Sequence, residues 1–495
     1  MPDLACSLKI NIAPENGRQS EELISVSADS YCARATRLGM HCSVMQGFNL
    51  SFRQYKLVLC TFKFLKQAIH MKFMLTALIG LLFIPFPFCY AQKSKKPQLL
   101  VYGTGISAYT AALQSAKSGV PTLWVADTDT LLPAFSKRSV ALEKKPDLDG
   151  GLWLDVLMHM AQSTTANDSL AQQVKNDMNP RLFMNAIASS LAETANLTVI
   201  RKQNVEDIKA HSKGWHITLA SKQKYNLPLV VDASNGEELI KLLPQHVRSK
   251  ENPLSPVSIM KTANMRTAVA TGFIADTLYA WTLADVLSSE RNGLFQMNDW
   301  QHAYGDDVRF TAAKAAIGQA VGATAAYLAF FKTTPDKIDV RKLQSEMMNY
   351  GMRIMPYADI AVSDPHFYAI QRFGLSGIIA GDKENGTYLF NGDAHVRYAE
   401  IQPILHRLFS RSQLWFADHQ GEFFTWGDFL SLVKFVGLRG NEVDKAIERE
   451  WHTKLKFAGE FDTTKRVTRY QFAVILDRYA SPYVKAVNQE GTFVN

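Results

Sequence analysis

Three small residues carry the spacing with the clearest chemical meaning: Gly103, Gly105 and Ala108. They fit the pattern GxGxxG/A, in which the first glycine permits a sharp turn from a strand into a helix. The second glycine lets the backbone approach a pyrophosphate, which then lies at the positive end of the helix. Alanine in the third place suits a helix that packs closely on its strand. The spacing therefore predicts a dinucleotide-binding turn.

A dinucleotide site of this kind also needs an acidic residue about 20 residues beyond the glycines, at the end of the second strand. The usual position, seven residues after the helix-ending Gly119, is occupied by Ala126, and the acid follows at Asp127. Because strand side chains alternate between faces, an offset of one residue points Asp127 the other way. Asp127 can hold the ribose only if the strand ends one residue early. The alternative is a nucleotide-type fold that no longer binds its ligand.

The elements that must position these residues follow from the hydrophobic pattern. Residues 97–102 form an apolar run typical of a buried strand, residues 107–118 predict a helix, and residues 121–125 predict the second strand. Farther along, Asn179-Pro180 introduces a helix through Leu191. Residues 197–208, a strand pair around 215–218 and the apolar run 227–236 complete the pattern. Strands alternating with helices predict an α/β fold.

This order resembles the FAD-dependent oxidoreductases of the glutathione-reductase type. The resemblance implies FAD as cofactor, with the backbone at Val205 beside the adenine. It also implies that Asp232 and Ala233 belong to the turn that follows a hydrophobic strand, although Asn235 here precedes the glycine of that turn.

Residues 294–347 resemble the closing FAD segment of a family of secreted bacterial FAD-dependent oxidoreductases, some of which are named xanthan lyase. The matching elements are Asn298-Asp299, His302, Arg309, and the run 318–322, which reads Gly-Gln-Ala-Val-Gly. The resemblance implies that Asp299 binds a ribityl hydroxyl and that Gly318 and Gln319 lie at the cofactor. His302 and Arg309 are weak candidates for catalysis, because such residues more often make surface or core hydrogen bonds. The small residues near Gly318 either let the backbone approach the ligand or pack tightly in a core.

The chain departs from this family in two places. Only residues 237–293 are available for a substrate domain, which is too few for a full one. Asp149-Gly150-Gly151 is either a glycine loop near the flavin or an ordinary turn before a helix. No HExxH, GxSxG, CxxC or Walker motif suggests another catalyst, and the histidines lack metal-ligand spacing. The sequence therefore predicts no metal site.

The front of the chain differs from the rest. Residues 71–91 combine Lys72, an apolar run and Cys-Tyr-Ala, which is the layout of a secretory signal peptide. The alternative is a membrane anchor, but Pro85 and Pro87 interrupt the run before the roughly 20 apolar residues that a span needs. Residues 1–70 are then expected to be a disordered, non-native upstream extension. We expect the working protein to be periplasmic or secreted, with no stable membrane span after cleavage.

Cysteine placement and charge limit the possible functions further. All five cysteines precede residue 90, so the main body can hold no disulfide, thiolate metal site or cysteine nucleophile. The first 91 residues hold nine Lys and Arg against five Asp and Glu, so the net charge falls from +8 to +4 without them. A near-neutral chain with scattered cations gives no reason to expect a nucleic-acid partner.

The tail carries an internal repeat. Five residues around Phe390 to Arg407 recur 71 positions later, and Gly374-Leu375-Ser376-Gly377 recurs in part 63 positions later. The pattern resembles an S-layer-homology repeat, with copies at about 364–409 and 427–479. Such modules usually come in threes and bind cell-wall polymer, so two divergent copies favour a helical accessory domain that packs on the flavin domain or contacts glycan. Its aromatic residues either form a sugar platform or lie in the core.

Together these patterns predict a glutathione-reductase-type Rossmann-like FAD-binding domain with a reduced cap over 92–350, and a mainly helical domain over 351–495. The predicted function is hydride transfer from an unknown substrate, a small molecule or carbohydrate, to the flavin. The alternative is a non-catalytic protein that binds glycan or protein on a decayed flavoprotein scaffold.

Overall fold

The computed structural model describes residues 96–142, 148–235, 238–244, 262–274, 277–297 and 308–494. The chain divides into two compact units, Met1–Gln92 and Lys93–Asn495, and every described residue belongs to the second. The predicted signal peptide, the upstream extension, the five cysteines, Asp299 and His302 lie outside the described residues. The described part of the chain contains no helix with the length and apolar character needed to cross a bilayer.

A six-stranded sheet forms the centre of this unit, in the order β10-β11-β7-β1-β2-β3. Its parallel strands are β1 (Leu99–Tyr102), β2 (Thr122–Val125), β3 (Leu197–Ile200), β7 (Leu229–Asp232) and β11 (Leu294–Gln296), and β10 (Glu290–Arg291) is antiparallel at the edge. Every residue of β1, β2 and β7 is buried, as expected for parallel strands covered on both faces. The predicted α/β fold is confirmed.

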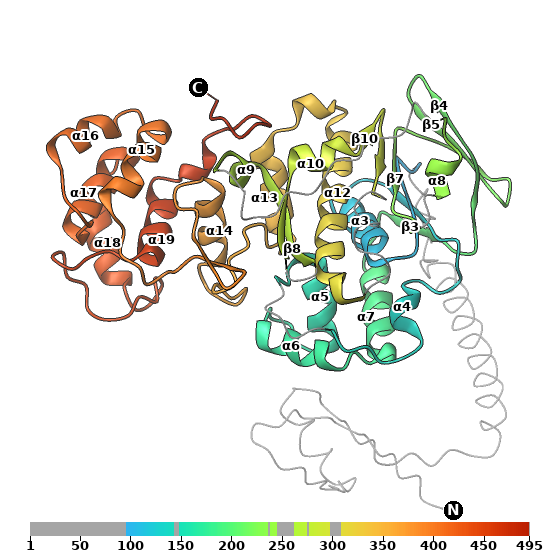
Figure 1. The fold of residues 1–495 in the computed structure, drawn as a ribbon, viewed down its shortest axis with the longest axis horizontal. Coiled ribbons are helices and arrows are strands. Elements are labelled where there is room, and N and C mark those ends of the chain that lie inside the picture. Colours follow the sequence, from blue (N-terminus) through green and yellow to red (C-terminus); the bar gives the residue numbers. More distant parts are fainter. Residues whose placement is uncertain are drawn as a thin grey trace, which may run out of the picture. The chain divides into compact units, whose positions relative to one another are not determined.

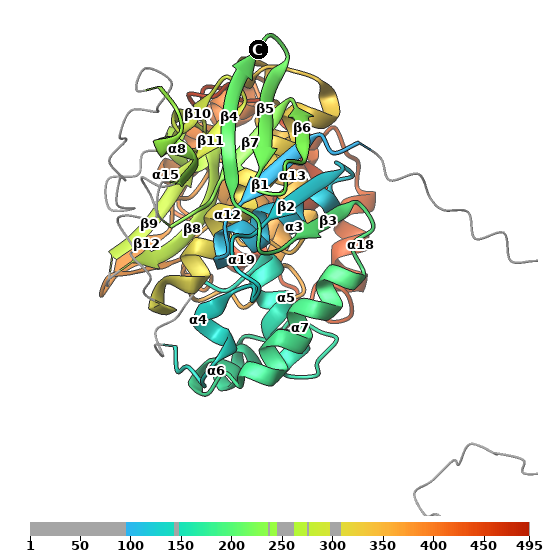
Figure 2. The same ribbon diagram turned by 90° about the vertical axis from the view of Figure 1, so that its right-hand side faces the viewer.

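A three-stranded antiparallel sheet covers one face of the central sheet (Figure 2). It consists of β4 (Val205–His211), β5 (Gly214–Leu219) and β6 (Lys224–Leu227). Alternate residues of β1 and β2, such as Leu100 and Val125, pack against Trp215 and Ile217 in a separate apolar cluster. Because the side chains of a strand alternate between the two sides of its sheet, β1 and β2 each contribute to two cores. The core described here lies between the central sheet and the three-stranded sheet.

Helices α3 (Ile106–Lys117) and α12 (Thr311–Phe331) cover the other face and lie side by side (Figure 1). Their contact is made by small residues. A Cβ on Gly318 would lie 2.4 Å from the Ser107 carbonyl oxygen, and a Cβ on Gly322 would lie 2.4 Å from that of Ala111. The Ser115 hydroxyl donates to the Gly322 carbonyl at 2.9 Å. The small residues of α12 therefore serve helix packing.

Replacing Gly322 with Ala is expected to lower the free energy of unfolding by about 1–3 kcal/mol, because the added methyl group would push α12 away from the α3 backbone. Urea denaturation followed by circular dichroism measures this. Gly427→Ala is the matched control: Gly427 also lies in a helix, α17 (Trp426–Gly437), but its Cβ would meet nothing nearer than 3.4 Å. A Gly322→Ala protein as stable as the control would contradict the packing argument.

The described residues between β2 and β3 form four helices. These helices lie together in Figure 1. They are α4 (Pro133–Ser136), α5 (Gly151–Met160), α6 (Asp168–Asn176) and α7 (Pro180–Ala192). The Asn179 side chain accepts the Arg181 and Leu182 backbone N–H groups, so the predicted start of α7 is confirmed with its cap.

The region expected to hold a substrate domain is small in the described residues. It contributes the short helices α8 (Glu238–Lys241), α9 (Thr262–Thr267) and α10 (Leu283–Ser288) and one hairpin of β8 (Ala268–Ile274) and β9 (Thr277–Thr282). The hairpin packs on α12, where a Cβ on Gly272 would lie 2.6 Å from that of Ala313.

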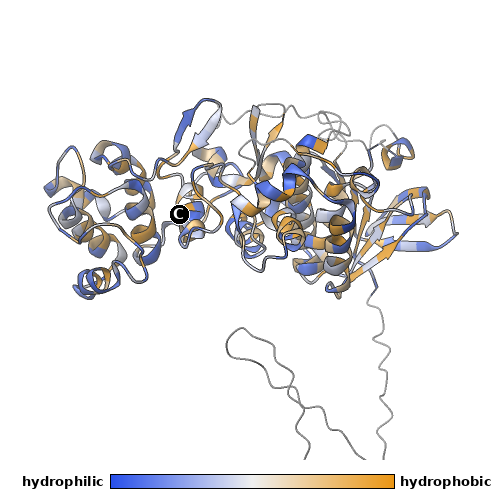
Figure 3. Cartoon of the chain, turned by 90° about the horizontal axis from the view of Figure 1, so that it is seen from below, coloured by the Kyte–Doolittle hydropathy of each residue, from blue (hydrophilic) through white to orange (hydrophobic). Residues whose placement is uncertain are grey.

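The chain continues after α12 as a mainly helical region. Its elements are α13 (Val340–Asn349), α14 (Phe367–Leu375), the hairpin of β12 (Asp382–Glu384) and β13 (Thr387–Leu389), α15 (Tyr398–Leu408), α16 (Ser412–Asp418), α17, α18 (Glu442–Glu450) and α19 (Arg469–Tyr479). Figure 3 shows hydrophobic residues gathered between these helices and hydrophilic residues on their outer sides. Of the aromatic residues considered for a sugar platform, Trp415, Phe416, Phe424 and Trp426 are buried and Phe423 is half-buried.

Three segments of this region form a closed ring of backbone hydrogen bonds. The Val396 N–H donates to the Val467 carbonyl at 3.2 Å. The Val467 N–H donates to the Phe424 carbonyl at 2.9 Å, and the Phe424 N–H donates to the Val396 carbonyl at 3.0 Å. A helix begins two residues after each member: α15, α17 and α19. The two predicted repeats contain Val396 and Val467. Phe424 adds a third equivalent segment between them.

The end of the chain packs back on α9 through a buried arginine. The Arg266 side chain donates to the Gly491 carbonyl at 2.8 Å and lies 4.2 Å from the centre of the Phe493 ring. Burial lowers the pKa of Arg266 to about 10, and nearby Arg407 adds to this effect. The tail is therefore part of the same packed unit as the hairpin region.

Candidate functional site

The glycine turn lies at the carboxyl end of β1, where it meets the turn after β7. Gly103 has φ +136°, and a Cβ there would lie 2.4 Å from the Ala233 carbonyl oxygen. The Ala233 N–H donates to the Tyr102 carbonyl at 2.8 Å, which holds the two turns together. Only glycine fits this position, because an L-residue would suffer both the backbone strain and the overlap. The turn predicted from the spacing is therefore present, and Ala108 is fully buried in α3 behind it.

The amino terminus of α3 is open to a ligand. Its N-cap is Gly105, which has extended backbone, and no described side chain caps the helix. A Cβ on Gly105 would meet nothing closer than the Asn235 Oδ1 at 3.9 Å. The first backbone N–H groups of a helix have no partner within it, so this end can receive an anion.

A cavity of about 300 Å³ lies at this helix end. It is lined by the glycine turn (residues 104–107), the start of α4 (residues 132–135), Asn235 after β7, and Val308, Thr311 and Lys314 at the start of α12. Leu132, at φ +54°, donates its N–H to the Thr104 carbonyl at 2.9 Å, which ties the α4 wall to the glycine turn. The cavity therefore lies between the amino termini of two long helices.

This cavity lies at the point where the strand order reverses. From β1 the chain proceeds through β2 to β3 on one side, and then places β7 and β11 on the other. Ligands of open parallel sheets bind at such a switch point, outside the carboxyl ends of the strands. The glycine turn, the uncapped helix and the cavity together fit the pyrophosphate of a dinucleotide.

The acid expected at the end of β2 is Asp127, one residue after Ala126. β2 ends at Val125, and Ala126 directly after it is fully buried, with its backbone bonded to Ile200 and Gln203. Asp127 is not among the described residues that line the cavity. It lies near Tyr102, whose hydroxyl donates to the Glu238 carboxylate. Burial and the nearby acids Glu238, Asp127 and Asp232 raise the pKa of Tyr102.

The predicted residues after β7 shape a turn. The buried Asp232 carboxylate accepts the Ser234 N–H at 3.1 Å and the Ser234 hydroxyl at 2.7 Å. Ala233 packs on Gly103 as described, and Asn235 reaches the cavity wall. Asp232 thus positions Ser234 and, through the chain, Asn235.

The predicted residues of α12 separate into two groups. Gly318 faces α3, and the Gln319 side chain is used inside the protein: it accepts the Leu152 N–H at 3.0 Å and donates to Gln114 Oε1 at 2.8 Å. Neither residue lines the cavity in the described part of the chain, whereas Thr311 and Lys314, one to two turns earlier, do. The sequence pattern indicated Gly318, but α12 begins seven residues earlier, at Thr311, and this first part of the helix lines the cavity.

Two further predicted residues lie on separate elements. Val205 begins β4 and pairs with Leu219, and it is largely buried. Arg309 lies in the short 3-10 helix Val308–Phe310 that leads into α12, with its guanidinium carbon 5.7 Å from the centre of the Phe310 ring. Arg309 is thus next to cavity residue Val308. The roles predicted for Val205, Arg309, Asp299 and His302 stay predictions.

Gly150 and Gly151 form the turn into α5. Gly151, at φ +56°, donates its N–H to the Gly351 carbonyl at 2.8 Å, and a Cβ on Gly150 would lie 2.8 Å from the Arg353 nitrogen. Gly150 is therefore required by the close approach of Arg353, and Gly151 by its left-handed backbone and by the Gln319 side chain, whose Oε1 would lie 2.0 Å from a Cβ.

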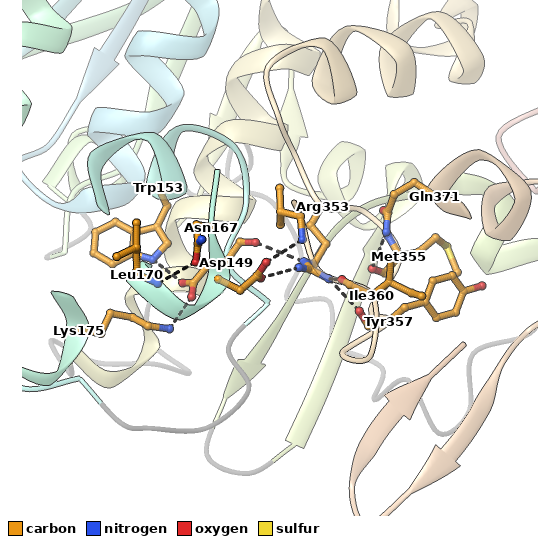
Figure 4. A network of polar contacts seen from close by, with 12 residues as sticks. Asp149, Trp153, Asn167, Leu170, Lys175, Arg353, Met355, Tyr357, Ile360 and Gln371 are labelled. Atoms are coloured by element: carbon orange, nitrogen blue, oxygen red, sulfur yellow. Dashed lines mark hydrogen bonds and ion pairs between the residues drawn. The ribbon is translucent and has the colours of Figure 1, made fainter. Parts of the chain in front are cut away.

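A buried ionic network supports this turn (Figure 4). The Asp149 carboxylate forms an ion pair with the Lys175 ammonium at 2.5 Å and accepts a hydrogen bond from the Trp153 indole N–H at 2.8 Å. Arg353 donates to the carbonyls of Tyr357 and Ile360, both at 2.8 Å, and pairs with Asp168 at 3.2 Å. Burial raises the pKa of Asp149 and lowers that of Arg353. In the described residues, no group of three or more His, Cys, Asp or Glu could hold a metal ion.

Known proteins resemble parts of this chain. Residues 98–242 match the family model of the FAD dependent oxidoreductases. No curated protein matches the chain. Solved structures that align with it include HlmI (14% identity, TM-score 0.18, 28% of this chain and 35% of that one). The bacillithiol disulfide reductase of Staphylococcus aureus aligns at 10% identity and TM-score 0.20, over 33% of this chain and 43% of the reductase.

OTEMO, solved in complex with FAD and NADP, aligns at 9% identity and TM-score 0.20, over 33% of this chain and 29% of OTEMO. The chain spans less than half the length of each of these solved proteins. The glycine turn and its cavity lie at the switch point of a parallel sheet. Together with the resemblance of residues 98–242 to the FAD dependent oxidoreductases, these features identify FAD as the cofactor that this part of the chain fits.

Proposed function

We propose that this protein oxidises a small-molecule or carbohydrate substrate by moving a hydride from a substrate carbon to the flavin of FAD. The observation that carries the proposal is the cavity between the glycine turn and the start of α12. FAD supplies the redox chemistry, which protein side chains lack, and accepts the two electrons that the substrate loses.

In this proposal, the chain's own residues bind and orient the cofactor and the substrate. Gly105 and the first N–H groups of α3 receive the pyrophosphate, and the α4 wall from Leu132 to Phe135 shields it from water. Asp299 is our candidate for a ribityl hydroxyl, and His302 and Arg309 are candidates for contact with the substrate. Among the described residues, the small hairpin region offers little protein to enclose a substrate, which favours an open site.

The export and partner assignments belong to the same proposal. A signal peptide at residues 71–91 would deliver the protein to the periplasm or the exterior, as for the secreted relatives, some named xanthan lyase, that residues 294–347 resemble. The ring through Val396, Phe424 and Val467 supports an S-layer-homology-like region, because such modules come in threes. We propose contact of this region with a cell-surface glycan and no nucleic-acid partner.

One observation favours a second candidate, a non-catalytic protein that binds glycan or protein on a flavoprotein scaffold. Ala126 is buried and apolar where a dinucleotide site usually has its ribose-binding acid. Loss of that acid weakens the adenosine end of the site, and a protein that no longer needs its cofactor tolerates such a loss.

The visible absorption spectrum of the purified protein separates the two candidates. The proposed enzyme is expected to be yellow, or to become so with added FAD, and to lose its colour when a substrate sugar is supplied without oxygen. A protein that binds FAD but is reduced only by dithionite, across a broad panel of sugars and alcohols, would favour the second candidate. A colourless protein with no thermal shift on adding FAD would contradict the enzyme proposal outright.

A further inference from the structure

We propose that the exposed side chains around the ring of backbone hydrogen bonds in the helical region bind a carboxylate-bearing polysaccharide. Arg397 and Arg466, which both lie against the Phe423 ring, receive the carboxylates. The inference deepens the proposed contact with a glycan and rests on it. It names the charge of that glycan and the residues that meet it, which the repeat pattern did not indicate.

The first observation is how the ring arranges the residues next to it. Its three members are fully buried, so the residues before and after each of them point away from the core. These flanking residues join the three segments in a cycle of isolated backbone bridges: His395 with Thr468, Arg397 with Phe423, and Thr425 with Arg466. The ring therefore holds side chains from distant parts of the sequence on one fixed support.

The second observation is the positive charge gathered on one aromatic ring. The guanidinium carbons of Arg466 and Arg397, both exposed, lie 4.3 Å and 4.8 Å from the centre of the Phe423 ring. The His395 ring lies 6.2 Å from it. In the described part of the chain Arg466 has no ion pair, and Arg397 has an exposed one of 3.6 Å with Glu422. Two like charges held this close repel each other, and a bound anion would offset the repulsion.

The third observation is that Arg397 occupies a position at which the other two segments have a helix cap. The equivalent residues Thr425 and Thr468 are N-caps, and each forms a capping box with the helix that follows. Arg397 is the N-cap of α15, but its side chain makes no cap hydrogen bond. A threonine there would have Glu400 three residues later, the spacing of a capping box. A cap absent at one of three equivalent positions is the kind of exception expected at a functional site.

The chemistry of these side chains indicates the class of ligand. A guanidinium group matches a carboxylate with two parallel N–H donors. Phe423 is half-buried, so part of its ring is available to the apolar C–H face of a sugar. Nucleic acid carries one phosphate charge per about 1.7 Å of its axis and needs a longer positive stripe, whereas this patch is short and includes Glu422. A polysaccharide with one carboxylate per sugar fits better.

The test measures binding of the full chain to three probes by isothermal titration calorimetry. Oligogalacturonate carries one carboxylate per sugar, its methyl ester has the same sugars without the charge, and oligoglutamate has the carboxylates without the sugars. The variants are Arg466→Gln, Arg397→Thr and the control Arg411→Gln. Arg411 lies 4.3 Å from the centre of the Phe435 ring, so the control removes the same stacking contact from a different aromatic ring.

Oligogalacturonate is expected to bind the wild type, with an affinity that falls as salt is raised. Arg466→Gln and Arg397→Thr should each bind it roughly 10-fold more weakly, the usual effect of losing one charge-assisted hydrogen bond. Arg411→Gln should bind like the wild type. The melting temperature of Arg397→Thr should equal or exceed that of the wild type, because threonine can cap α15. Weaker binding by a protein of undiminished stability excludes a merely structural role for Arg397.

Equal binding of oligogalacturonate and its methyl ester would overturn the inference while leaving the proposed glycan contact in place. Unchanged affinity in Arg466→Gln and Arg397→Thr would do the same. Oligoglutamate bound as tightly as the acidic sugar would overturn it too, because the partner would then be an acidic protein. A wild-type chain that binds neither oligosaccharide would overturn the inference and the glycan contact together. Hydride transfer to FAD is tested separately by the visible spectrum.

Discussion

Replacing Lys175 with Met is expected to lower the free energy of unfolding by about 3–5 kcal/mol, the usual cost of leaving a buried charge without its partner. Lys175 is 1% exposed and Asp149 is 2% exposed, and they are joined at 2.5 Å (Figure 4). Methionine fills a similar volume, so the loss comes from the unpaired carboxylate and not from a cavity. Urea denaturation measured by circular dichroism gives the value.

The loss should depend on pH. Burial already raises the pKa of Asp149, and removing the ammonium group raises it further. The folded variant then holds a proton that the unfolded chain, with a carboxyl pKa of about 3.9, releases. Between these two pKa values the folded state binds more protons, so stability falls as pH rises. The deficit of Lys175→Met relative to the wild type should therefore be smaller at about pH 5 than at about pH 8.

Two variants test the assignment to the buried pair. Lys202→Met removes the lysine of an exposed pair with Asp129, whose side chains are 68% and 66% exposed, and should change stability by no more than about 1 kcal/mol. Adding Asp149→Asn to Lys175→Met should recover part of the loss, because a neutral amide needs no counter-ion. A Lys175→Met protein that is as stable as Lys202→Met would show that the pair contributes little.

This network connects stability to the cofactor half of the molecule. Asp149 directly precedes the Gly150-Gly151 turn, and Arg353 packs on Gly150 and donates to the Asp149 carbonyl at 3.3 Å. The same turn receives Gln319 of α12 through the Leu152 N–H. Replacing Lys175 therefore affects the start of α5 and, through Gln319, also α12, the helix that begins at the cavity.

The local parts of the fold could be predicted from the sequence. The glycine turn, the apolar strands and the Asn179-Pro180 helix start each depend on residues that are close together in the chain, and all three elements are present. The dinucleotide-binding role of the turn stays a prediction. Contacts between distant segments carry no such signal. Asp149 and Lys175 meet only once the helices pack, and no motif pairs them. Gly322 ends the run 318–322 noted in the sequence, but nothing in that run indicates Ala111 as its contact.

The third ring segment shows the same limit. The repeats around Val396 and Val467 share enough residue types to be recognised when the sequence is aligned with itself at a shift of 71 positions. Around Phe424 the shared feature is a capping box, in which Thr425 accepts the Asp428 N–H, as Thr468 accepts that of Gln471. A pair of polar residues three apart is common at helix starts, so it does not identify a repeat. The third segment is identified instead by the ring of backbone hydrogen bonds through Val396, Phe424 and Val467.

Replacing Gly103 with Ala is expected to lower the free energy of unfolding by more than about 4 kcal/mol, beyond the range of ordinary substitutions. Alanine at φ +136° is strained, and its Cβ would lie 2.4 Å from a carbonyl oxygen of the backbone. That oxygen cannot move freely, because the Ala233 N–H is bonded to Tyr102 in the neighbouring strand. Relief requires β1 and β7 to separate at their carboxyl ends.

Gly105→Ala is the matched variant, and it separates folding from binding. Gly105 has φ −81°, which alanine adopts freely, and a Cβ there would meet nothing within 3.9 Å. Its stability should thus stay within about 1 kcal/mol of the wild type. The same methyl group would project from the cavity wall, where the backbone must approach the pyrophosphate, so FAD affinity should fall at least about 10-fold.

Thermal denaturation and FAD titration of both proteins give the two readouts. A Gly105→Ala protein that binds FAD as tightly as the wild type would mean that the ligand does not reach the turn, even though the fold is intact. A Gly103→Ala protein of normal stability would mean that the turns after β1 and β7 are not in contact. Because the two glycines are two residues apart, only the difference in their surroundings can produce opposite effects on stability and binding.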